Sequence, residues 1–191
     1  MLYIRASKPY VSQCKECRNL AKGKFRMENI YLNLKKNKVS INFTIIRYIT
    51  NNELDCENEC DYITKTNLLE CYYNYTEENG DWGSVGDVKI SADELYELSN
   101  LLKKVLKKEI CSFHFETQKP LFALDISKIN DRYSFCFNVA DGLMPDTWIE
   151  VTFEELDIEG LTKYADVFLK WSEMFPVLSK EDLKEIEVIK W

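Results

Sequence analysis

The chain contains no run of eighteen apolar residues, so no segment is long enough to span a membrane as an apolar helix. Its first residues, MLYIRASKPYVSQCKECR, lack the apolar stretch and the small-residue cleavage site of a signal peptide. We therefore expect a cytoplasmic protein without a membrane partner. Its 191 residues, 46% hydrophobic and 30% charged, have the composition of an ordinary globular protein.

Recognisable catalytic motifs are also missing. The sequence has no G-x-S-x-G, Walker A, G-x-G-x-x-G or H-E-x-x-H pattern. Its one histidine, His114, lies in SFHFE, where a strand would point it away from Phe113 and Phe115, toward the more polar side. Acidic residues are abundant, but an acid–base pair needs two of them at a set distance in a cleft. The sequence therefore predicts a protein that is not an enzyme.

Seven cysteines is an odd number, which together with a cytoplasmic location argues against a disulfide framework. Three of them, Cys71, Cys111 and Cys136, lie in apolar alternating runs, where a thiol is expected to behave as a small buried hydrophobe.

The other four cysteines form two close pairs, Cys14 with Cys17 and Cys56 with Cys60. Four thiolates suit tetrahedral zinc, and the first pair has the spacing of a zinc knuckle. The second pair is more widely spaced, and 38 residues separate the two pairs. We favour reduced thiols without a metal and therefore expect no cofactor, with zinc bound by these four residues as the alternative.

The charges are unevenly distributed along the chain. Residues 1–50 hold eleven Lys and Arg against two Asp and Glu, whereas residues 51–191 hold fourteen against thirty. The two parts could bind different partners or neutralise each other on a shared surface. The basic residues of the N-terminal part, with the aromatic side chains of Tyr10 and Phe25, are of the types that contact phosphates and stack on bases. The acidic residues 51–191 would, however, repel a long polyanion. Nucleic acid is therefore the less favoured partner.

Alternating apolar and polar residues predict a series of strands. A hairpin is expected from ENIYLNL, the turn KKNK and VSINFTIIRYIT, followed by strands in TNLLECYYNYT and DVKI with the turn ENGDWGSVGD between them. Four more strands are expected in ICSFHFE, LFALDIS, RYSFCFNVA and TWIEVTF. Short polar connections favour antiparallel pairing.

Two principal helices are predicted. The first begins at the capping box SADE, which starts at Ser91, and ends near Lys108. The second covers Ile158–Phe175 and stops at Pro176, with Thr152 and Glu155 as a second capping-box candidate. A third, short helix led by Ser179 and Asp182 is also expected.

The predicted fold is α+β, a mainly antiparallel sheet of about seven to eight strands with two principal helices packed on it. The two strand-then-helix halves echo each other weakly. Residues 1–27 form a basic appendage with the C-x-x-C pair, and residues 28–191 form a single domain.

Over about residues 28–177 the chain resembles the WapI-like bacterial immunity proteins. The resemblance lies in the opening hairpin, DYITKTNLLECYYNYTEENGDW, ISADELYELSNLLKKVL, FHFETQKPLFALDISK and the closing helix that runs to KWSEMFP. It implies a non-enzymatic binding protein that neutralises a sibling toxin domain by forming a tight inhibitory complex.

Toxin domains that attack nucleic acid tend to be basic, and the acidic part of this chain could steer toward such a partner. The loops ENGDWGSVGD and ADGLMPD are the contact candidates, because they combine apolar or aromatic anchors with carboxylates. The candidate residues are Asp81, Trp82, Asp141, Met144 and Asp146. The alternative function is a zinc-binding adaptor for nucleic acid or protein that uses the N-terminal cysteines and the basic segment.

Overall fold

The computed structural model describes residues 30–49, 67–118, 121–141 and 147–179. These ranges contain eight strands and two helices, which confirms the α+β class. In chain order they are β1 (Leu32–Lys36), β2 (Val39–Tyr48), β3 (Leu68–Thr76), β4 (Trp82–Ser91), α3 (Ala92–Leu106), β5 (Ser112–Glu116), β6 (Phe122–Ile129), β7 (Arg132–Ala140), β8 (Trp148–Leu156) and α4 (Ile158–Met174).

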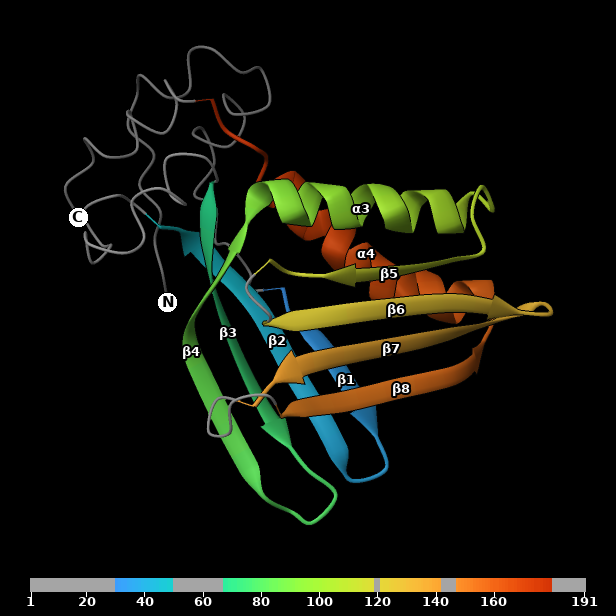
Figure 1. Ribbon diagram of the computed structural model, residues 1–191, viewed down its shortest axis with the longest axis horizontal. Helices are drawn as coiled ribbons and strands as arrows, with labels where there is room; N and C mark the ends of the chain where they lie inside the picture. Colours follow the sequence, from blue (N-terminus) through green and yellow to red (C-terminus); the bar gives the residue numbers. More distant parts are fainter. Residues whose placement is uncertain (1–29, 50–66, 119–120, 142–146, 180–191) are drawn as a thin grey trace.

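The strands form two sheets, not the single sheet expected from the sequence. The first sheet has the order β1-β2-β3-β4 and the second has the order β5-β6-β7-β8, and all neighbours are antiparallel. Each sheet is a meander followed by one helix, so the chain consists of two halves of the same design. Figure 1 shows the strands of the two sheets crossing at a wide angle, with both helices along one side.

Local sequence signals explain most element boundaries. Asn37 adopts a φ of 55° in the β1–β2 turn, a backbone conformation that asparagine tolerates well. Ser91 caps α3 in the predicted capping box, since its hydroxyl accepts from the Glu94 N–H and the Glu94 carboxylate accepts from the Ser91 N–H.

Three local predictions differ from the structure. The residue that caps α4 is Asp157, and Thr152 lies inside β8, so the second capping box is wrong. Strand β4 begins at Trp82 and not near Asp87, because WGSV continues the pairing with β3. Ser179 is not helical, and the remainder of the expected third helix falls outside the described residues.

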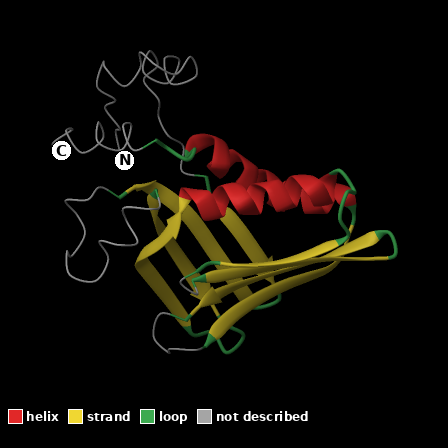
Figure 2. Ribbon diagram, turned by 45° about the horizontal axis from the view of Figure 1, so that its top comes forward, coloured by secondary structure: helices red, strands yellow, loops and turns green. Residues whose placement is uncertain are grey.

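A single apolar core joins the two halves, and Phe43 of β2 lies at its centre. Its ring contacts Tyr73 of β3 within the first sheet, Phe122 and Phe137 of the second sheet, and Trp171 of α4, at centroid distances of 5.5 to 6.0 Å. Helix α4 thus packs against both sheets. Figure 2 shows both helices on the same side of the two sheets.

We expect Phe43→Ala to lower the free energy of unfolding by about 3–5 kcal/mol, because it leaves a cavity where four rings meet. Urea denaturation followed by fluorescence and by circular dichroism would measure this loss. Ile129→Ala, which truncates an exposed apolar side chain, is the control and should change stability by less than about 0.5 kcal/mol. Separate transitions for the two halves in the wild-type protein would contradict a shared core.

Candidate functional site

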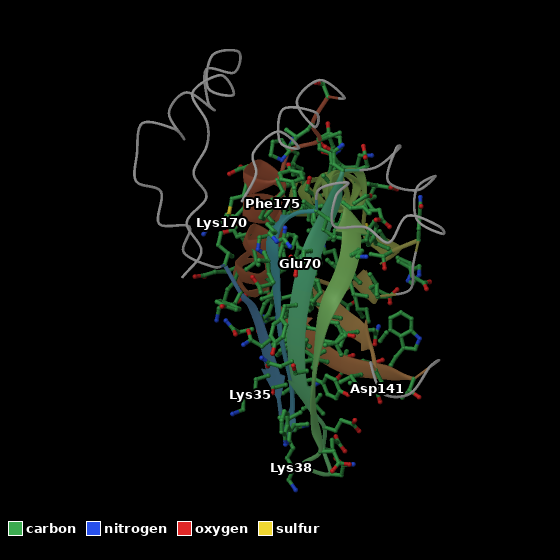
Figure 3. All side chains as sticks on the ribbon, turned by 90° about the vertical axis from the view of Figure 1, so that its left-hand side faces the viewer. Lys35, Lys38, Glu70, Asp141, Lys170 and Phe175 are labelled. Atoms are coloured by element: carbon green, nitrogen blue, oxygen red, sulfur yellow. The ribbon has the colours of Figure 1, made fainter. Side chains whose placement is uncertain are left out.

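The structure connects β3, which leads into the first predicted loop, with Asp141 and Thr147, which flank the second. The hydroxyl of Tyr75, near the end of β3, donates to Asp141 Oδ1 at 2.7 Å, just after β7. The Tyr73 hydroxyl donates to the Ala140 carbonyl. The Asp141 N–H then donates to the Thr147 carbonyl at 2.7 Å, which fixes where the connection to β8 starts and ends. Figure 3, which looks onto the first sheet, shows Asp141 beyond its β4 edge.

Gly83 makes this link possible. It pairs with Tyr75 across β3 and β4, and a Cβ at Gly83 would lie 2.4 Å from the Tyr75 ring. The ring therefore crosses β4 at a position where no side chain obstructs it, and from there its hydroxyl reaches Asp141.

Gly83→Ala should destabilise the protein by about 1–3 kcal/mol, because the new methyl group displaces the Tyr75 ring. The matched test is the same substitution in a Tyr75→Leu background, where the obstructing ring is absent and the cost should fall below about 1 kcal/mol. Urea denaturation of the four proteins completes the cycle. Equal costs in both backgrounds would show that the ring is not the cause.

Burial perturbs both tyrosines. It raises the pKa of the Tyr73 hydroxyl to about 12, with a smaller contribution from the Asp141 carboxylate. The pKa of Tyr75 is raised as well, first by burial and then by its hydrogen bond to Asp141. In the folded protein both hydroxyls therefore stay protonated, as donors to the second half, well above the pH at which a free tyrosine ionises.

The free energy of unfolding should fall as the pH rises from about 10 to about 12. In that window the unfolded chain has released the Tyr73 proton and the folded protein retains it, so this residue contributes a slope of about −1.4 kcal/mol per pH unit. Its contribution is fully present below about pH 10. Denaturation at several pH values should show a shallower slope for Tyr73→Phe, with Tyr96→Phe as the control for loss of a surface hydroxyl. An unchanged slope would contradict the shift.

Two of the five predicted contact residues are exposed to solvent, at the β3–β4 turn and the start of β4. Trp82 is 75% exposed, and Asp81 is exposed in the β3–β4 turn, where the Asn79 side chain bonds both its N–H and its carboxylate. Asp141 is only 9% exposed, and its hydrogen bond from Tyr75 gives it a structural role. Met144 and Asp146 lie outside the described residues.

Sequence reasoning missed the residues that form a notch. The notch has a volume of about 340 Å³ and lies between the β3–β4 turn and the first residues of β8. Its lining residues include three glutamates, Glu77, Glu78 and Glu150, together with Trp148 and Val39. The available signal is Trp148 and Glu150, which lie on the same face of the correctly predicted strand TWIEVTF. We call Glu77, Glu78, Asp81, Trp82, Trp148 and Glu150 together the acidic end.

Charge differs between the two halves. Among described residues the first half, up to Cys111, holds nine basic and nine acidic residues, and the second half holds four basic and eleven acidic residues. Among these residues the excess of acidic side chains therefore lies in the second half. The acidic end lies where the acidic half meets the β3–β4 turn.

The predicted zinc ligands Cys14, Cys17, Cys56 and Cys60 lie outside the described residues, as does the appendage of residues 1–27. Within the described ranges no group of three His, Cys, Asp or Glu side chains is arranged to hold a metal ion.

The remaining cysteines differ in their surroundings. Cys71 is buried as expected, and burial raises the pKa of its thiol. Cys136 is half-buried, and its thiol pKa is also raised, mainly by burial. Cys111 is exposed, so its assignment as a buried hydrophobe is wrong, because it precedes β5 instead of lying in it.

His114 lies on the outer face of the second sheet, as predicted. Its Nδ1 lies 2.7 Å from Asp125 Oδ1, and the hydrogen bond to Asp125 raises the pKa of the imidazole. Asp125 pairs with His114 on one side and with Cys136 on the other. The carboxylate thus separates the imidazole from the thiol, and this row does not form the adjacent nucleophile and base that covalent catalysis needs.

Comparisons with known proteins do not assign the chain to a family. No protein-family model matches the chain, and no curated protein is similar enough in sequence to be counted as a relative. None of the described helices combines the length and the apolar character needed to cross a membrane.

Proposed function

We propose that this chain is a non-enzymatic binding protein, and specifically an immunity protein that neutralises a basic bacterial toxin domain through a tight complex. The observation that supports it most is Trp82, a large aromatic side chain that is 75% exposed beside a turn that carries Glu77, Glu78 and Asp81. Exposed tryptophans surrounded by polar residues are the side chains on which protein interfaces most depend.

The charge distribution supports a basic partner. The acidic second half would attract such a partner over a distance, and the acidic end would meet it at short range. Lys36 ends β1 and Lys38 follows in the neighbouring β1–β2 turn, at the tip of the hairpin (Figure 3), so the acidic surface has a basic border on this side. Such a border favours one orientation of a charged partner.

The proposal is tested by purifying the tagged full-length protein from the cells that produce it, at moderate salt, and identifying what accompanies it by mass spectrometry. Recovery of the C-terminal fragment of one large secreted protein in near-equal amount is the expected result. Recovery of nucleic acid, or of no protein in comparable amount, would refute the immunity function.

In the purified complex, Trp82→Ala should weaken binding by about 2 kcal/mol, or about 30-fold, through loss of a central aromatic contact. The stability of the free protein should hardly change, because the side chain is exposed. Tyr96→Ala, which removes a 57% exposed ring from α3, is the matched control and should leave the affinity unchanged. The reverse pattern, measured by calorimetry, would place the interface on α3.

A further inference from the structure

The notch at the acidic end gathers negative charge without an internal counter-charge. Among the described residues no lysine or arginine forms an ion pair with Glu77, Glu78 or Glu150. Lys36, at the end of β1, and Lys38, in the turn that follows, form no such pair either. Glu150 has two neutral donors, the Thr152 hydroxyl at 2.7 Å from its Oε1 and the Cys136 thiol, and neither cancels its charge. Three like charges around one hollow favour a cation that comes from outside.

The walls of the notch indicate which kind of cation fits. Trp148, 37% exposed, presents part of its indole, and the half-buried Val39 adds apolar surface. A flat, weakly hydrated guanidinium can stack on an indole while its N–H groups donate to carboxylates, whereas a hydrated ammonium ion makes poorer use of such a wall. The volume of about 340 Å³ lies at the lower end of the roughly 300–1,000 Å³ that is typical of ligand pockets.

We propose that this notch receives an arginine side chain from the protein partner. The inference rests on the proposed function and narrows it, since it names the group that the partner inserts and the side chains that receive it. Trp148 forms the stacking wall, and Glu78 and Glu150, from opposite sides of the notch, accept the guanidinium N–H groups. Trp82, which pairs with Thr76, is not part of the lining and contributes separate contact area at the acidic end.

The test is a nuclear magnetic resonance titration of the full-length, ¹⁵N-labelled protein with N-acetyl-arginine amide. The indole N–H signal of Trp148, assigned with Trp148→Phe, should move and saturate with a dissociation constant of about 1–10 mM, as expected for a single side chain. The signal of Trp171, buried in the core, should not move. N-acetyl-citrulline amide has nearly the same shape without the charge and should produce at most a tenth of the response.

Charge-neutral variants locate the site. The double variant Glu78→Gln/Glu150→Gln should weaken arginine binding at least tenfold, and Asp166→Asn/Glu173→Gln, which removes the same charge from exposed positions on α4, should leave it unchanged. The inference is overturned if Trp148 does not respond, responds equally to citrulline, or responds in a saturable way to magnesium chloride alone. It is also overturned if both double variants behave alike.

The same variants separate this inference from the proposed function. If a protein partner co-purifies and Glu78→Gln/Glu150→Gln binds it with unchanged affinity, the arginine assignment fails and the immunity function stands. If the notch binds capped arginine as described but no partner co-purifies, the site stands and the immunity function fails.

Discussion

The packing of Phe43 is the constraint on which the rest of the structure depends. Each sheet has one apolar face, and the residues of both faces belong to one core together with those of the two helices. Phe43 projects from the first sheet into a group of rings supplied by β6, β7 and α4, so the apolar faces of both halves are buried together. Aromatic edge-to-face contacts have preferred geometries, which makes this junction more specific than a contact between aliphatic side chains. The relative position of the two sheets, and with it the notch between them, follows from this packing.

Two buried carboxylates add hydrogen bonds between the two halves, away from the aromatic core. Asp141 accepts from Tyr75, and Glu94 accepts from Ser91 with one oxygen and from the Gln118 N–H at 2.7 Å with the other. Each carboxylate lies in one half and is held by a donor from the other half. A buried carboxylate without donors would be costly, so both bonds oppose movement of one half against the other. The hydrogen bond between Tyr75 and Asp141 therefore holds the segments that carry the acidic end to both sheets.

Local patterns in the sequence predicted the elements well and their assembly poorly. Alternation identifies the inward residues of a strand, and the SADE box identifies the start of α3, because both signals depend on neighbours within a few residues. Alternation does not say which sheet an inward residue faces, so two meanders were merged into one sheet. The same limit applies to the site. The exposure of Asp81 follows from its turn, but the burial of Asp141 depends on Tyr75, 66 positions earlier, and on the absence of a side chain at Gly83. The notch combines Glu77 and Glu150, which no local pattern relates.

The boundary between basic and acidic residues in the sequence does not coincide with the boundary between the two halves of the fold. Along the sequence the change of sign falls near residue 50, whereas in the structure the described first half is balanced and the second half carries the excess of acid. A field from one half acts over about one Debye length, about 8–10 Å at physiological salt, and brings a basic partner close without selecting a pose. Selection needs short-range contacts, and these are available at the notch where Trp148 and three glutamates come together, between the two halves. The acidic second half thus attracts the partner, and the notch recognises it. The shared aromatic core fixes the position of these two parts relative to each other.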